Sequence, residues 1–98
     1  MLHIVNKSPL ERNSLAACLR IAGSGTILLI EDAVYGAIRG TTVEAAVKEA
    51  LVRFRIVALQ PDLDARAVAD RVIEGVGTVD YAGFVDLVAE HRNCQSWL

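Results

Sequence analysis

The run TILLI at positions 26–30 predicts a buried β-strand. A half-exposed strand alternates apolar and polar residues, whereas a strand covered on both faces does not need to. Two acids, Glu31 and Asp32, follow the run directly, and a short helical turn then extends to Gly40. We predict that this strand lies at the centre of a parallel sheet, where partners and ligands meet the loops at the carboxyl ends of the strands.

Other apolar runs predict further strands at 2–5 and at 56–59, with a short fourth strand at 78–79. Pro61 ends the strand at 56–59, because proline has no N–H to donate to a neighbouring strand. The tail at 94–98 contains Trp97, which is too apolar to be left in water. We therefore expect the tail to dock as a last strand or against a partner.

Four helical segments separate these strands. Ser8 and Pro9 predict a turn at 8–12, followed by a helix from position 13 that Gly23-Ser24-Gly25 ends. The helix places four apolar residues at i, i+3, i+4 and i+7, and so on one face. These residues are Leu15, Cys18, Leu19 and Ala22.

The next helix starts with a capping box made by Thr41 and Glu44. Its outer side carries two i,i+4 ion pairs, Glu44–Lys48 and Glu49–Arg53. Its apolar stripe consists of Val43, Ala46, Val47, Ala50, Leu51 and Phe54.

Two shorter helices are predicted near the carboxyl end. Asp62 is expected to cap one helix that runs to about Ala69, and Asp80 is expected to cap the last helix. The apolar stripe of this last helix is Tyr81, Phe84, Val85 and Val88. Alternating strands and helices with short connections predict an α/β fold in three layers, α/β/α, with a mainly parallel sheet of four to five strands. Its length predicts a single domain over residues 1–98.

The composition points to association with other chains. Ala, Val, Ile, Leu, Met, Phe, Trp, Cys and Gly make up 57 of the 98 residues, and the mean hydropathy is +0.37. That share is about 58 %, against about 45–50 % in ordinary soluble domains. A chain this short leaves more than about a third of its unfolded-chain surface exposed. We predict an oligomer with an apolar interface; the alternative is an unusually apolar monomer.

Charge and leader signals exclude several classes of protein. The net charge of −2 gives no electrostatic reason to bind nucleic acid. No apolar run approaches about 18 residues, and the amino terminus lacks the pattern of a signal peptide, so we expect a cytoplasmic protein without a membrane span. Two cysteines, Cys18 and Cys94, do not make a secreted disulfide framework.

Candidate sites for phosphate, metal or hydrolysis are weak. The glycines at 23–25 precede a strand, whereas a phosphate cradle needs them before a helix. His3 and His91 show no metal-ligand spacing with the cysteines, so no metal and no cofactor is expected. Ser8 is explained by capping. Asp32 stands at the end of a strand, as the phosphoacceptor of a receiver domain does. The acidic pair that receiver domains carry after their first strand is missing here. A helix cap or an interface acid is therefore the better interpretation of Asp32.

The two thiols are the remaining candidates for chemistry, because a thiolate can accept and pass on sulfane sulfur. That role requires exposure and a lowered pKa. Cys18 lies in the middle of a helix on an apolar stripe, so a buried core role competes with a persulfide role. Cys94 lies in the polar tail and is expected to be exposed, but a role for it is not indicated.

Several motifs together resemble the DsrH/TusB family. They are MLHIVNKSPLERNSLAACL, LLIEDAVYGAIRGT, ALQPDLDARAVADRV, VDYAGFVDLV and the closing QSWL, and they extend from Met1 to Leu98. The resemblance implies a DsrE-like fold and a small subunit of a cytoplasmic heterohexamer. Its partners would be DsrE/TusD-like and DsrF/TusC-like sister subunits, and the complex would pass persulfide sulfur to a DsrC/TusE-like carrier.

By this comparison the chain lacks the principal sulfur-accepting cysteine. It has Ala58-Leu59-Gln60 where the DsrE/TusD-type sister carries that thiol, so a non-catalytic subunit is expected. Cys18 matches a cysteine of DsrH subunits of sulfur oxidisers, which favours dissimilatory sulfur oxidation over 2-thiouridine formation in tRNA and keeps Cys18 as a candidate persulfide carrier. The residues that we predict at interfaces are Glu31, Asp32, Tyr35 and Trp97.

Overall fold

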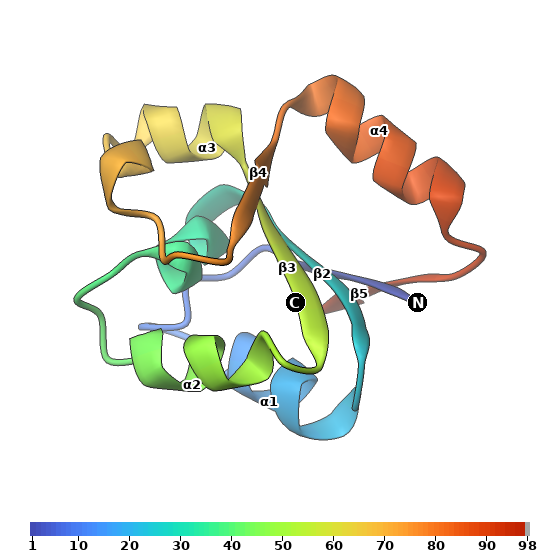
Figure 1. Cartoon of the computed structure of the whole chain (residues 1–98), viewed down its shortest axis with the longest axis horizontal. Coiled ribbons are helices and arrows are strands. Elements are labelled where there is room, and N and C mark those ends of the chain that lie inside the picture. The colour runs from blue at the N-terminus through green and yellow to red at the C-terminus, as the bar shows by residue number, and fades with distance from the viewer. Residues whose placement is uncertain (98) are drawn as a thin grey trace.

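The computed structural model describes residues 1–97 and contains one sheet of five parallel strands (Figure 1). The strand order is β4-β3-β2-β1-β5, so the predicted central strand is the middle one. The predicted last strand also exists, and it pairs in parallel with β1; Leu98 lies outside the described residues. The strands are β1 (Leu2–Val5), β2 (Gly25–Leu29), β3 (Phe54–Leu59), β4 (Gly77–Val79) and β5 (Cys94–Trp97).

Helical segments connect these strands, at or near the predicted positions. The α-helices are α1 (Ser14–Ile21), α2 (Glu44–Ala50), α3 (Gln60–Ala65) and α4 (Tyr81–Glu90). Two 3₁₀ segments, η1 (Glu31–Ala37) and η2 (Ala69–Arg71), follow β2 and α3.

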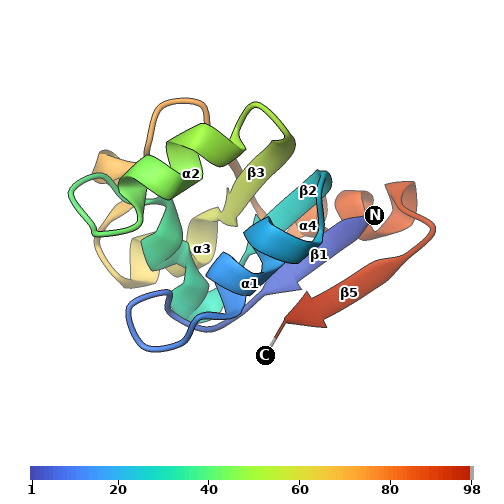
Figure 2. The ribbon, with the colours of Figure 1, turned by 90° about the horizontal axis from the view of Figure 1, so that it is seen from below.

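The strand order determines which face of the sheet each connection covers. The chain steps in one direction from β1 to β2, β3 and β4, and then returns across the whole sheet to β5. Because crossovers between parallel strands are right-handed, the first three connections lie on one face and the return lies on the other. Figure 2 shows α1 and α2 in front of the sheet and α4 behind it.

The two faces of the sheet bury very different amounts of apolar material. The first face packs against α1, η1, α2 and α3, and its cluster includes Leu15, Cys18, Ile27, Ile56 and Leu63. Within residues 1–97, the second face is covered by α4 alone, and its cluster of buried residues is Leu2, Leu28, Val57 and Leu87. The predicted three-layer architecture is therefore confirmed, with a second helical layer that consists of one helix of ten residues.

Helix α2 differs from its prediction. Phe54 is the first residue of β3 and not part of the helical stripe, because the chain turns at 51–53. The pair Glu44–Lys48 forms at 2.7 Å. Arg53 donates instead to the backbone carbonyls of Gly23 and Leu19, at 3.2 Å and 3.3 Å, so the predicted Glu49–Arg53 pair is replaced by a link to the end of α1.

The two carboxyl-terminal helices also differ in part. The Asp62 carboxylate accepts from the Glu31 N–H and does not cap α3, which already begins at Gln60 with Pro61 in its first turn. Asp80 does cap α4, because its Oδ1 accepts from the Gly83 N–H at 2.8 Å. The predicted apolar stripe of α4 is not the face that packs against the sheet. Of its four residues only Phe84 is partly buried, and the other three are exposed. Leu87, which was not part of the predicted stripe, is buried.

Candidate functional site

The carboxyl edge of the sheet brings together acids from two connections. Glu31 follows β2 and has a φ of +52°, in the left-handed region that residues other than glycine rarely adopt. Its N–H donates to Asp62 Oδ2 at 2.6 Å, from a position 31 residues away in the sequence. This hydrogen bond satisfies the amide and supports the unusual backbone conformation of Glu31, whose side chain is exposed.

Arg66 links the same two connections. Its Nε and Nη2 donate to Asp32 Oδ1 at 3.0 Å and 2.8 Å, and its Nη1 donates to the Asp62 carbonyl at 3.1 Å. The guanidinium is largely covered, whereas the Asp32 carboxylate is mostly exposed, so the pair is only partly screened by water. The sequence identified Glu31 and Asp32 as candidates, but it gave no sign that Arg66 would fix them.

The residue that directly follows β3 carries an amide and not a thiol. Gln60 starts α3, and its Nε2 donates to Asp64 Oδ1 at 2.9 Å. At the same edge, the side-chain oxygen Oδ1 of Asn6 is buried and has no hydrogen-bond partner in the described part of the chain. These two residues offer hydrogen bonding but no nucleophile.

Cys18 lies in the core. Its side chain is fully buried in the first apolar cluster, and burial raises the pKa of its thiol to about 11. A thiol in this state is protonated at neutral pH and inaccessible, and both properties oppose sulfur transfer. Within the single chain, the geometry favours the core role over the persulfide role.

Cys94 and Trp97 occupy the two ends of β5. Cys94 is exposed and lies at the amino end of the strand, next to Leu2 and therefore at the opposite edge of the sheet from Glu31. The Trp97 indole N–H donates to His3 Nδ1 at 3.2 Å, and the His3 ring in turn meets Phe54 edge-on at 6.5 Å between centroids. Burial of His3 lowers the pKa of its imidazole.

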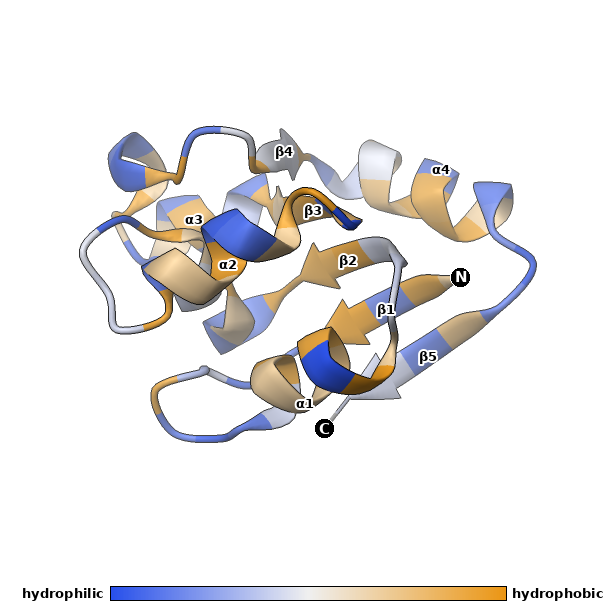
Figure 3. Ribbon diagram, turned by 60° about the horizontal axis from the view of Figure 1, so that its bottom comes forward, coloured by the Kyte–Doolittle hydropathy of each residue, from blue (hydrophilic) through white to orange (hydrophobic). Residues whose placement is uncertain are grey.

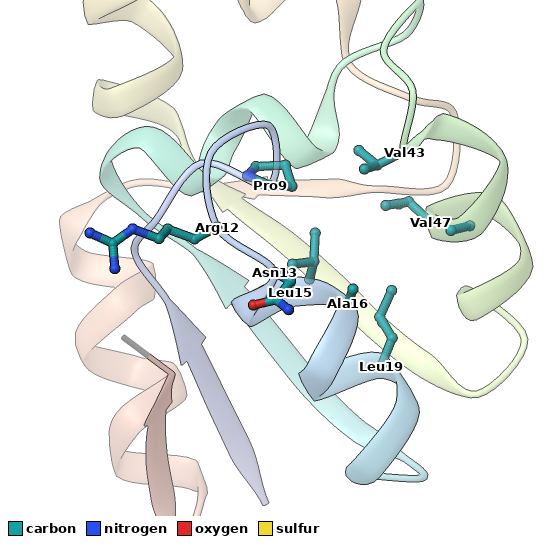
Figure 4. Close-up of a pocket in the computed structure, with 9 residues that line it drawn as sticks. Pro9, Arg12, Asn13, Leu15, Ala16, Leu19, Val43 and Val47 are labelled. Carbon is teal, nitrogen blue, oxygen red and sulfur yellow. The ribbon is translucent and has the colours of Figure 1, made fainter.

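Tyr35 lies in η1, where it is partly buried against the first apolar cluster. A pocket of about 100 Å³, which Tyr35 does not line, opens between α1 and α2 (Figure 4). Leu15, Leu19 and Val47 are among its lining residues, and the Arg12 side chain extends away from them. The pocket is mainly apolar, and Asn13 is also among its lining residues.

Neither a metal site nor a membrane span is found in the described residues. No group of three or more His, Cys, Asp or Glu residues among positions 1–97 is arranged to hold a metal ion. Within the same range, no helix has the length and apolar character needed to cross a bilayer.

Comparison with known proteins assigns the family. Residues 7–94 match the family described as DsrH like protein. The chain belongs to the DsrH-like family. Protein TusB of Klebsiella pneumoniae (strain 342) is 35 % identical over 98 residues, covering 99 % of this chain and 100 % of the relative. Protein TusB of Escherichia coli O81 (strain ED1a) is 32 % identical with the same coverage.

Solved structures support the fold of this DsrH-like chain. The ychN protein of E. coli has a TM-score of 0.82 at 18 % identity, covering 97 % of both chains. A protein of unknown function from Methanobacterium thermoautotrophicum has a TM-score of 0.76 at 19 % identity, covering 97 % of this chain and 95 % of that one. At these identities the likeness shows the shared α/β architecture alone.

Proposed function

We propose that this DsrH-like chain is a small, non-catalytic subunit of a cytoplasmic sulfur-relay complex. It associates with DsrE/TusD-like and DsrF/TusC-like sister chains in a heterohexamer, and the complex passes persulfide sulfur to a DsrC/TusE-like carrier. In this assembly the chain contributes contact surfaces for the sister subunits, while the sulfur-accepting thiol belongs to one of those sisters.

The observation that carries this proposal is the lack of an available thiol at the carboxyl edge of the sheet, as far as residues 1–97 describe it. A thiol at the end of β3 would lie at the start of α3, where the helix dipole favours a thiolate, but that position holds Gln60. Cys18 is buried in the core, and Cys94 lies at the amino-terminal end of the parallel strands. The residues present suit contact with a partner better than chemistry.

We propose Glu31, Asp32, Tyr35 and Trp97 as contact residues at this edge. The Asp62 carboxylate holds the Glu31 backbone, and the Glu31 side chain is exposed, so its carboxylate is available to a partner. Trp97 lies at the carboxyl end of the edge strand β5 and is only partly covered.

The pathway has two candidates. The motifs of the chain favour sulfur oxidation, with Cys18 at a position shared with DsrH subunits of sulfur oxidisers. The relatives named Protein TusB favour the second candidate, 2-thiouridine formation in tRNA. The two pathways predict different rescue: in a TusB-deficient bacterium, the chain and its sister subunits restore 2-thiouridine only if the tRNA pathway is the correct one.

Co-expression tests the subunit role. We expect native mass spectrometry to show the chain in one complex with the DsrE-type and DsrF-type sister chains of its own organism. After loading with a sulfane sulfur donor, the mass gain of one sulfur is expected on a sister chain and not on this one. A chain that stays alone in the presence of both sisters would contradict the proposal.

A further inference from the structure

We propose that the outer face of α4 is a docking surface for a different protein chain, one whose contact surface is apolar and bordered by Lys or Arg. This inference rests on the proposed function, because it names a second surface through which the subunit would join its assembly, in addition to the contact residues at the carboxyl edge of the sheet. The outer face of α4 is defined by its exposed apolar residues, Tyr81, Ala82, Val85, Val88 and Ala89.

The exposure of these side chains is unusual for a helix that caps a sheet. Tyr81 is 61 % exposed, Val85 66 % and Val88 39 %, and they follow one another at i, i+4 and i+7. At about 100° per residue, the five residues of the outer face cover roughly a third of the helix circumference. Hydropathy colouring of the ribbon shows apolar, orange segments in α4 that alternate with hydrophilic, blue ones (Figure 3).

The outer face continues directly into the buried face. Phe84 and Leu87 pack against the sheet beside Val88, so the apolar surface extends around most of the helix and leaves only Asp86 and Glu90 as a charged side. A helix that is apolar on nearly all sides is typical of a buried position. In the single chain α4 is buried on one side only, and a partner on the outer face would complete its burial.

The other large apolar side chains that are exposed in the described part of the chain do not come from one element. Met1, Leu10, Ile21 and Val52 belong to four separate segments, whereas the outer face of α4 gathers its residues on one helix. Single exposed apolar residues are ordinary in soluble proteins, whereas a contiguous apolar patch marks an interaction site. The outer face also carries a tyrosine, which is enriched at protein interfaces.

Charge decides between a second copy and a different chain. Helix α4 and its cap contain Asp80, Asp86 and Glu90 and have no Lys or Arg; Arg92 follows in the loop after the helix. Two copies of α4 packed together would place acids opposite acids, which opposes self-association. A partner with Lys or Arg around an apolar centre would pair with Asp86 and Glu90 and exclude water from Val85. The proposed partner is therefore a different chain with such a surface.

Matched valine variants test the docking surface. Val85→Asp places a charge at the centre of the outer face, while Val52→Asp places the same charge at a valine that is 86 % exposed in the turn after α2. Each variant is co-expressed with the DsrE-type and DsrF-type sister chains, and complex formation is measured by native mass spectrometry and by affinity. We expect Val85→Asp to weaken association by at least about tenfold and Val52→Asp to leave it within about twofold.

A charge-reversed variant tests the predicted basic border and covers a failure of Val85→Asp to fold. Asp86→Lys combined with Glu90→Lys changes two exposed residues and leaves the apolar faces intact. We expect it to weaken association at low ionic strength, with a smaller effect at high ionic strength. Circular dichroism of each variant checks that the fold is kept.

The outcomes separate this inference from the proposed function. If the wild-type chain forms no complex with its sisters, the proposed function fails. If the wild-type complex forms and Val85→Asp associates as well as Val52→Asp, the docking surface is overturned while the subunit role stands. A wild-type homodimer that Val85→Asp breaks would identify a second copy as the occupant and would also overturn the inference.

Discussion

The Trp97 indole N–H donates to His3 Nδ1 at 3.2 Å, so the last strand is joined to the first by a side-chain hydrogen bond in addition to the parallel ladder. Nδ1 can accept this bond only when it carries no proton. The arrangement therefore requires a neutral His3, and burial, which lowers the pKa of His3, acts in the same direction.

Acidification is expected to destabilise the protein through His3. The unfolded chain takes up a proton below about pH 6.5, while the folded chain resists it, so the free energy of unfolding falls as the pH decreases from about 6.5. Urea titrations at about pH 7 and pH 5 measure this loss. The chain has one tryptophan, and its fluorescence reports directly on the broken Trp97–His3 bond.

Two histidine variants control this pH experiment. His3→Gln is expected to be less stable at neutral pH but nearly independent of pH between 7 and 5. His91→Gln alters the histidine at the end of α4 and leaves the Trp97–His3 bond in place, so it serves as the matched substitution. Equal pH dependence in wild type and His3→Gln would contradict the assignment.

Cys18 is expected to behave as a core thiol. A thiol reagent should modify the exposed Cys94 in the folded protein and reach Cys18 only after denaturation. A rapid reaction of Cys18 in the folded chain, or a persulfide at Cys18 after loading with a sulfur donor, would instead restore its candidacy as a sulfur carrier. Mass spectrometry of the two modified peptides distinguishes these results.

The raised pKa of Cys18 also predicts a pH effect at the alkaline side. The unfolded thiol loses its proton near its ordinary pKa, whereas the folded thiol keeps it up to a pKa of about 11. The folded state then binds more protons, so the free energy of unfolding decreases as the pH rises from about 9 to 11. Cys18→Ala is expected to be less stable at neutral pH and to show a smaller decrease in that interval, as measured by urea midpoints.

Glu31 offers a test of backbone strain at the candidate interface. Glycine adopts a φ of +52° without the cost that other residues meet, so Glu31→Gly is expected to keep or raise stability, by up to about 1 kcal/mol. Glu31→Val is expected to lower it by about 1–2 kcal/mol, because a β-branched residue fits this region poorly. Denaturant unfolding compares the two variants. A valine variant more stable than the glycine variant would show that the backbone at position 31 is not strained.

The cap of α4 is expected to matter for stability. Asp80→Ala removes the acceptor of the Gly83 N–H and should cost about 1 kcal/mol in the free energy of unfolding. Asp86→Ala, which removes an exposed acid of the same helix, should change it by less than about 0.5 kcal/mol. Similar losses in both variants would show that the Asp80 contact is not a significant cap.

Local patterns were sufficient to predict most of the fold. The unbroken apolar run at 26–30 predicted the central strand, and Asp80 predicted the start of α4, because both signals depend on neighbouring residues only. The burial of α4 was harder to predict. Its apolar residues lie on nearly all sides, so periodicity alone could not show that Leu87 would face the sheet and Val85 the solvent.

The contacts at the candidate site were beyond local reasoning. Asp62 looked like a helix cap because it follows Pro61, but the fold places its carboxylate beside the Glu31 amide, 31 residues earlier. Arg66 reaches Asp32 over 34 residues. Such pairs depend on how β2 and β3 align in the sheet, and the sequence of either segment contains no sign of the other.

The return of the chain across the sheet has a consequence for folding during synthesis. The first face can be completed from β1, β2 and β3 with the helical segments that follow them, whereas the second face has no cover until α4 and β5 have left the ribosome. Leu2, Leu28 and Val57 are therefore open to water, and to other nascent chains, until α4 and β5 have left the ribosome.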